Sequence, residues 1–92
     1  MISVVVPVYK EEGNIMPFLE RLEPVLESIG SYEILFCMDP SPDRTEDVVR
    51  KEIERNVNIR LIVFSRRFGQ PASVIAGIQQ SLGETCVVID VD

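Results

Sequence analysis

Apolar residues fall in four short runs that alternate with longer stretches of mixed character. The runs are Ile2 to Val8, Tyr32 to Met38, Ile59 to Ser65 and Thr85 to Val91. The first run is almost wholly apolar, as expected of a strand that is buried on both faces of a parallel sheet. The pattern therefore predicts four β-strands.

Between these runs, apolar residues recur at steps of three and four, which predicts helices. The predicted helices span about 14–29, 45–55 and 71–82. Asp43 or Ser41 is available to cap the second helix. The order β-α-β-α-β-α-β predicts an α/β fold with a doubly wound, mainly parallel sheet, built as one unit over residues 1–92.

Composition and charge narrow the classes of function. Nine Lys and Arg residues against 15 Asp and Glu residues give a net charge of −6, which argues against nucleic acid as a partner. Histidine is absent, which excludes the usual zinc sites and Ser-His-Asp triads. Cys37 and Cys86 lie in apolar runs, so we expect buried free thiols. No run reaches the ~20 apolar residues of a membrane span and no signal-peptide pattern is present, so we expect a cytoplasmic chain.

Polar residues gather after the ends of the predicted strands. These places are 7–12, 39–45, 65–70 and 90–92. In an open parallel sheet, ligands bind beyond the carboxyl ends of the strands. The shared position of the four polar segments therefore predicts one binding site at this edge.

Two of these segments carry candidates for binding a nucleotide. Tyr9 could cover the face of a nucleobase beside the backbone of Pro7, and Glu11 could contact base or ribose. Alternatively, Glu11 is a solvated residue at the start of a helix, where acidic side chains are favourable, and it binds no ligand. Asp39 could accept a hydrogen bond from a base N–H, or it could bind the backbone of its own turn.

The other two segments carry charges suited to phosphate and metal. Arg66 or Arg67 could offset phosphate charge, or both could be exposed loop arginines. Asp90 and Asp92 are two residues apart at a strand end, where both can converge on one hard cation. Mg²⁺ or Mn²⁺ prefers such oxygen ligands and commonly bridges carboxylates to phosphates.

Four segments in this order resemble a known family. ISVVVPVYKEEGNI resembles the opening VVVPVYNEE of family 2 glycosyltransferases, and YEILFCMDPSPDRT resembles their segment DDGSPDRT. LIVFSRRFGQPASVIAGIQQSLGE resembles the segment with S-R-N-F-G and A-G-x-x-x-A-x-G, and VVIDVD resembles the strand that carries the D-x-D. The resemblance covers the whole chain. It is strongest to the enzymes that glycosylate polyprenyl (dolichol or undecaprenyl) phosphates.

The chain departs from the family pattern at four positions. Lys10 and Arg67 each stand where the family has Asn, and Met38 stands where it has the first Asp of the pair. Pro40 replaces the family's glycine and cannot take a glycine conformation, because its ring fixes φ. We therefore expect an altered base loop and an altered choice of nucleotide.

The resemblance implies the N-terminal part of a GT-A fold that performs metal-dependent, inverting sugar transfer from a UDP- or GDP-sugar to a polyprenyl phosphate. The positions that match the base and ribose site are Pro7, Tyr9, Glu11 and Asp39, and Asp90 is also expected to take part in nucleotide binding. Asp90 and Asp92 match the metal motif, with Asp92 the more direct ligand to Mg²⁺ or Mn²⁺. The catalytic and lipid-phosphate acceptor residues would follow Asp92. We therefore expect a truncated, inactive chain, and a full-length protein at the cytoplasmic face of the membrane.

Other classes of protein remain open. A non-catalytic nucleotide-binding or regulatory module predicts nucleotide affinity that does not depend on metal. A receiver-like signalling domain is disfavoured, because it needs an acidic pair after the first strand, where this chain has Pro-Val-Tyr. The exposed edge of the fourth strand could also pair with a second copy in a homodimer.

Overall fold

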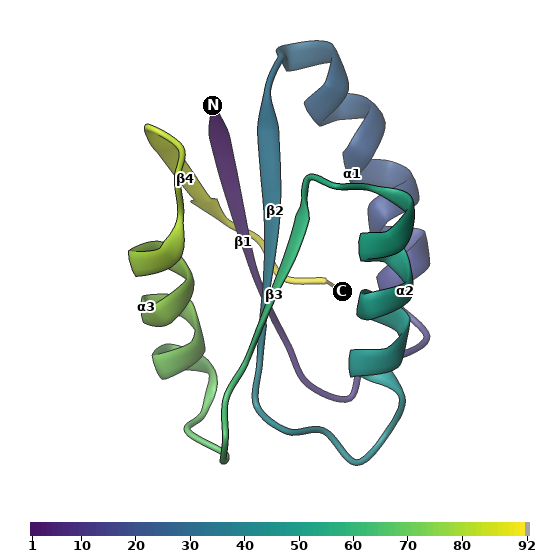
Figure 1. The fold of residues 1–92 in the computed structure, drawn as a ribbon, viewed down its shortest axis with the longest axis vertical. Helices are drawn as coiled ribbons and strands as arrows, with labels where there is room; N and C mark the ends of the chain where they lie inside the picture. Colours follow the sequence, from purple (N-terminus) through teal and green to yellow (C-terminus); the bar gives the residue numbers. More distant parts are fainter. Residues whose placement is uncertain (92) are drawn as a thin grey trace.

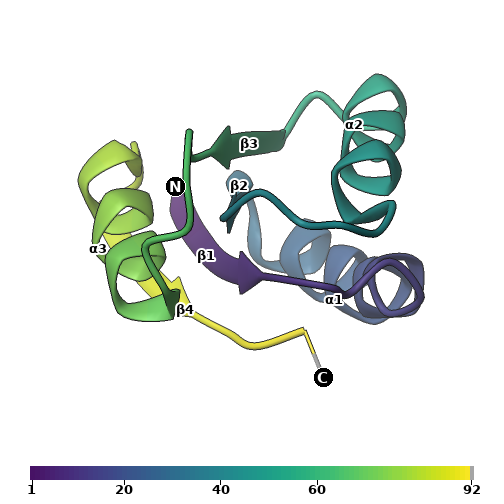
Figure 2. The same ribbon diagram turned by 90° about the horizontal axis from the view of Figure 1, so that it is seen from below.

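The computed structural model describes residues 1–91 and forms one parallel sheet. Its strands, in the spatial order β3-β2-β1-β4, are β1 (Ile2–Val8), β2 (Tyr32–Met38), β3 (Ile59–Val63) and β4 (Thr85–Val88). The helices are α1 (Ile15–Ile29), α2 (Thr45–Arg55) and α3 (Gln70–Gln80). Helices α1 and α2 cover one face of the sheet and α3 covers the other (Figure 1 and Figure 2). The doubly wound α/β fold predicted from the sequence is confirmed.

Burial on both faces of the sheet explains the apolar character of β1 and β2. Successive side chains of a strand point to opposite faces. Val4 and Val6 belong to the larger core cluster, which includes residues of α1 and α2. Val5 lies on the other face, in a smaller cluster with Leu35 and Cys37. Each of these side chains is at most 1% exposed, so neither face of the central strands meets water.

Helix α3 ends at Gln80, two residues before the predicted end, because buried polar side chains take up the backbone donors that follow it. The N–H of Leu82 donates to the Glu33 carboxylate at 2.7 Å, and the N–H of Gly83 donates to Ser3 Oγ at 2.8 Å. In a longer helix the same N–H groups would bond to carbonyls one turn back. The connection from α3 to β4 is thereby fastened to β1 and β2.

Strand β4 ends at Val88 rather than at the predicted Val91. Its last pair joins Val88 to Val5, and the N–H of Ile89 donates to the Val5 carbonyl at 3.0 Å. Two residues further along β1, on the same side, comes Pro7, which has no N–H to continue the ladder. The chain therefore leaves the sheet at this point and runs past the end of β1.

Strand β4 forms one edge of the sheet, and all four of its residues are exposed. Cys86 is consequently exposed, so the prediction that it is buried was wrong. Cys37 is a buried free thiol, as predicted, and burial raises its pKa to about 11. Pairing of the β4 edge with a second copy stays a prediction. None of the helices described within residues 1–91 is both long and apolar enough to cross a membrane.

Candidate functional site

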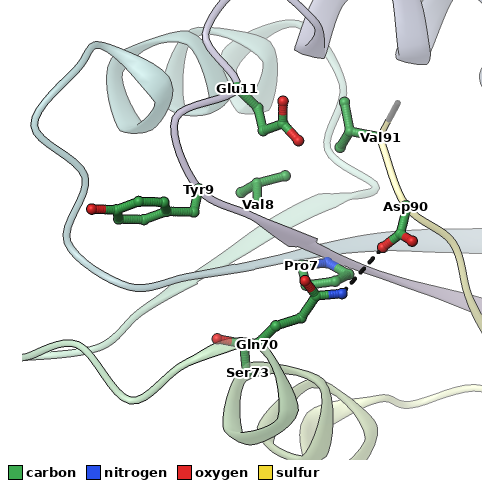
Figure 3. A pocket seen from close by; sticks show the side chains of 8 residues that line it. All are labelled: Pro7, Val8, Tyr9, Glu11, Gln70, Ser73, Asp90 and Val91. Carbon is green, nitrogen blue, oxygen red and sulfur yellow. Dashed lines mark hydrogen bonds between the residues drawn. The ribbon is translucent and has the colours of Figure 1, made fainter.

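A pocket of about 330 Å³ opens where β1 and β4 end (Figure 3). It is lined by Pro7, Val8, Tyr9, Glu11, Gln70, Ser73, Asp90 and Val91. The strand order reverses between β1 and β4, because β2 and β3 follow β1 on one side and β4 lies on the other. Crevices of this kind lie at the carboxyl ends of strands, where the two neighbouring connections leave on opposite faces. The pocket is therefore a consequence of the topology.

The segment after β1 is held by the segment after β2. The N–H of Lys10 donates to Ser41 Oγ at 3.1 Å, and the N–H of Glu11 donates to Thr45 Oγ1 at 2.8 Å. Thr45 is fully buried at the start of α2. The carboxylate of Glu11 accepts a hydrogen bond from the Asn14 side chain at 2.9 Å. These contacts fix Glu11 at the wall of the pocket.

Asp43 joins these two segments. Its carboxylate accepts hydrogen bonds from Ser41 Oγ at 2.5 Å, from the Thr45 N–H at 3.1 Å and from Thr45 Oγ1 at 2.7 Å. The N–H of Glu12 donates to it at 3.4 Å. Burial raises the pKa of Asp43, but these hydrogen bonds outweigh it and lower the pKa to about 2. The N-cap position of α2 is Arg44 rather than Asp43 or Ser41, yet Asp43 satisfies the first backbone donor of the helix.

Asp39 holds the loop between β3 and α3. Its carboxylate accepts the N–H of Phe68 at 3.1 Å and the N–H of Gly69 at 2.8 Å, and the residue is only 5% exposed. The loop begins after Val63, so β3 is two residues shorter than predicted. Asp39 thus has partners within the protein in another loop, and its predicted contact with a nucleobase stays a prediction.

The Tyr9 ring points away from Asp90, at the far end of the pocket (Figure 3). The guanidinium carbon of Arg67 lies 4.4 Å from the ring centroid, and Lys10 Nζ lies 5.6 Å from it. Both distances fall within the range of cation–π contacts. Lys10 has a φ of +55°, in the left-handed region that asparagine tolerates well and lysine rarely adopts. The asparagine of the family pattern at this position therefore suits a backbone conformation that Lys10 adopts under strain.

Asp90 lies at the rim of the pocket, opposite the first turn of α3. The side-chain amide of Gln70 donates to Asp90 Oδ1 at 3.3 Å (Figure 3). Val91, only 2% exposed, is anchored in the larger core cluster and fixes the segment that carries Asp90. The first turn of α3 also contributes Ser73 to the pocket.

An exposed carboxylate at the rim suits Mg²⁺ or Mn²⁺, which binds proteins through one or two carboxylates together with substrate phosphates. Asp92, the second predicted ligand, lies outside the described residues. Over residues 1–91 no three His, Cys, Asp or Glu side chains form a group that could hold a metal ion. That Asp90 binds a metal ion together with Asp92 stays a prediction.

The structure brings four of the predicted site residues into one pocket, namely Pro7, Tyr9, Glu11 and Asp90. Sequence reasoning placed Gln70 in one of the four segments at this edge but named neither Gln70 nor Ser73 as a site residue. The available signal was that the third helix begins at the same edge of the sheet, which places its first polar residues there. What these side chains bind stays a prediction.

Comparison with known proteins supplies the family. The family model described as Glycosyl transferase family 2 matches residues 3–92, nearly the whole chain. The chain belongs to glycosyl transferase family 2. Among curated members, the undecaprenyl-phosphate 4-deoxy-4-formamido-L-arabinose transferase of Pseudomonas paraeruginosa is 34% identical, over 100% of this chain and 28% of that protein. The uncharacterized glycosyltransferase YkcC of Bacillus subtilis is 38% identical, over 98% of this chain and 28% of that protein. The chain thus spans about 28% of the length of these relatives.

Solved structures of glycosyltransferases share the fold. The mannosyltransferase PcManGT from Pyrobaculum calidifontis, solved in complex with GDP-Man and Mn²⁺, has a TM-score of 0.82 and 25% identity. The match covers 99% of this family 2 chain and 27% of that chain. TarS of S. aureus has a TM-score of 0.75 and 25% identity, over 99% of this chain and 16% of that chain. The sheet with its covering helices is therefore part of the GT-A architecture that the resemblance implied.

Proposed function

We propose that the protein is the nucleotide-sugar-binding part of an enzyme that transfers a sugar from a UDP- or GDP-sugar to a polyprenyl phosphate, with Mg²⁺ or Mn²⁺ as cofactor. The observation that carries the proposal is the pocket at the strand switch point, whose lining includes Pro7, Tyr9, Glu11 and Asp90. Two comparisons support it. One relative is named as an undecaprenyl-phosphate 4-deoxy-4-formamido-L-arabinose transferase. The structurally similar mannosyltransferase PcManGT was solved in complex with GDP-Man and Mn²⁺.

The order of the lining residues along the pocket indicates how a sugar nucleotide would lie in it. The base would sit at the Tyr9 end, against the ring and the backbone of Pro7, with Glu11 next to the ribose. The diphosphate would lie toward Asp90 and the first turn of α3. The N-terminal end of a helix carries partial positive charge and unbonded N–H groups, both of which favour an anion.

Asp90, together with Asp92, would hold the divalent ion. The ion would hold the diphosphate and offset the negative charge that builds on the leaving group. An oxygen of the acceptor phosphate attacks the anomeric carbon of the sugar, and the bond from that carbon to the nucleoside diphosphate breaks with inversion. The electron pair leaves with the diphosphate. The acceptor phosphate is already anionic, so none of the described residues is needed as a general base.

The acceptor lipid and the attachment to the membrane would depend on regions that lie outside this chain, since the chain spans about 28% of the length of its relatives. We therefore expect negligible transfer by the 92-residue chain alone, and activity of the full-length protein at the cytoplasmic face of a membrane. A turnover assay with UDP- and GDP-sugars and a short-chain polyprenyl phosphate checks this. Robust transfer by the chain alone would contradict it.

Calorimetric titration with UDP and GDP, with and without Mn²⁺, tests the proposal. We expect metal-dependent binding of one of the two nucleotides, with binding abolished in Asp92→Ala and strongly weakened in Asp90→Asn. Asp47→Asn is the matched control, because Asp47 is an exposed acidic residue on α2 that does not line the pocket. Binding that is equal with and without Mn²⁺ would favour a non-catalytic nucleotide-binding module. Binding of neither nucleotide would overturn the proposal.

A further inference from the structure

Arg67 is one of three arginines, with Arg21 and Arg66, that form no ion pair within residues 1–91 of this acidic protein. Four other arginines form ion pairs with carboxylates, namely Arg44, Arg50, Arg55 and Arg60. Within residues 1–91, Arg67 has no carboxylate within ion-pair distance and lies instead over the ring of Tyr9, 4.4 Å from its centroid. An arginine at the binding edge of the sheet is thus held by an aromatic ring of the pocket.

The loop that carries Arg67 is anchored next to it. Asp39 accepts the N–H groups of Phe68 and Gly69, the two residues that follow Arg67. The rings of Phe64 and Phe68 meet edge to face with their centroids 5.5 Å apart, which closes the loop on itself. The backbone at Arg67 is therefore fixed relative to β2. Only its side chain can leave Tyr9 without unfolding the loop.

This contact conflicts with a free stacking position on Tyr9. In the proposed function the base of the nucleotide lies against the Tyr9 ring, where the guanidinium of Arg67 now lies. A guanidinium leaves a partly exposed ring such as that of Tyr9 readily if a phosphate is within reach, because a bidentate pair with phosphate oxygens is the stronger interaction. A nucleoside diphosphate bound in this pocket brings the competing base to the Tyr9 ring, and it brings the phosphate toward the first turn of α3, which begins at Gln70, three residues after Arg67.

We propose that Arg67 gates the nucleotide site: its guanidinium covers the Tyr9 ring in the free protein and moves to the diphosphate when a nucleotide binds. The inference rests on the proposed function, because it assigns the base and the diphosphate to this pocket. It makes Arg67 a determinant of specificity for phosphorylated ligands. A nucleoside without phosphates must displace the guanidinium and offers it nothing in return.

The gate predicts effects of opposite sign for two ligands. Arg67→Asn introduces the family's residue at this position and removes the shorter of the two cation contacts on the Tyr9 ring, since Lys10 Nζ lies 5.6 Å from the centroid. The variant should bind the free nucleoside, uridine or guanosine, about 2–5-fold more tightly, which corresponds to the loss of one exposed cation–π contact. It should bind the matching diphosphate, UDP or GDP, about tenfold more weakly, because a charge-assisted contact is lost. If Arg67 acted only through net charge, its replacement would not strengthen the binding of a neutral nucleoside.

Titration of the 92-residue chain with a nucleoside and its diphosphate in the presence of Mn²⁺ tests the gate. Lys51→Gln is the control for net charge, because Lys51 is an exposed cation on α2 that does not line the pocket. It should change both affinities less than twofold, since exposed charges beyond a Debye length are largely screened. In parallel, the NMR signal of Arg67 Hε should be shifted upfield by the Tyr9 ring in the free protein, and it should move downfield when the diphosphate is added. Tyr9→Leu should lack the upfield shift.

The outcomes separate the gate from the function on which it rests. Opposite signs for the two ligands in Arg67→Asn, with the expected NMR shift, support the gate. If the wild-type chain binds the diphosphate but Arg67→Asn changes both affinities in the same direction, or changes neither, the gate is wrong and the proposed function stands. If the wild-type chain binds neither UDP nor GDP, the proposed function and the gate are both wrong.

Discussion

Gly77 lets α3 approach the sheet closely enough to place its first turn at the pocket. A Cβ atom at this position would lie 2.5 Å from Val5 Cγ1 and 2.7 Å from Cys37 Sγ. Both neighbours are fully buried on the central strands, so neither can move into solvent. We predict that Gly77→Ala destabilises the protein, and that it weakens nucleotide binding because α3 must move outward.

The magnitude follows from two opposing terms. Forcing an extra methyl group into a packed core costs about 1–3 kcal/mol, and the contacts at Gly77 favour the upper part of that range. Alanine in place of glycine in a helix returns about 1 kcal/mol. The free energy of unfolding should therefore fall by about 1–2 kcal/mol, and the melting temperature by roughly 5–15 °C for a chain of this size.

Urea denaturation followed by circular dichroism measures this loss. Gly13→Ala is the matched control, because a Cβ atom there would meet nothing within 4 Å, and it should change stability by less than about 0.5 kcal/mol. In the double variant Val5→Ala/Gly77→Ala, the new methyl group gains room, so the loss should be smaller than the sum of the single losses by at least about 0.5 kcal/mol. A Gly77→Ala protein as stable as the wild type would refute the close approach of α3.

Three further predictions follow from single side chains. Asp39→Asn leaves an amide that can accept only one of the two loop N–H groups. Urea denaturation should therefore show that the free energy of unfolding falls by about 1.5–3 kcal/mol. An unchanged denaturation midpoint would contradict the role of Asp39 as an anchor of the loop. The pKa of Asp43 in the folded protein is about 2, below its ordinary value of 3.8. The ionised carboxylate therefore stabilises the folded protein above about pH 4, and this contribution is lost as the pH falls toward 2. Asp43→Asn should therefore be less stable than the wild type at pH 7 and equally stable near pH 2, and a difference that persists at pH 2 would be evidence against this assignment. Cys86 is exposed and Cys37 is buried with a pKa of about 11, so a thiol reagent should modify one cysteine in the native protein and two in denaturant.

The strands and helices could be predicted from the sequence because their periodicity is a local property. The boundaries of several elements could not, because they depend on partners elsewhere in the chain. Helix α3 stops where Glu33 and Ser3 capture its next donors, and β4 stops where its neighbour β1 reaches Pro7. Neither partner is visible in the residues of the element that it ends.

The location of the site was predictable for a related reason. The carboxyl ends of parallel strands meet at one edge whatever the loops do, so Tyr9 and Asp90 share a pocket as the sequence indicated. Contacts between loops depend on conformation and were not predictable. Asp39 anchors a loop that lies about 30 residues further along the chain, and Arg67 reaches Tyr9 from that same loop.

The most direct test of the central claim is the position of the metal ion in the nucleotide complex. Bound Mn²⁺ broadens the NMR signals of nearby amides, and in a chain of net charge −6 it has other acidic surfaces to choose from. With the nucleoside diphosphate present, the broadening should be strongest around Asp90, Val91 and Gln70. Broadening centred instead on Glu23 and Glu52, between α1 and α2, would show that the pocket at the ends of β1 and β4 does not hold the ion.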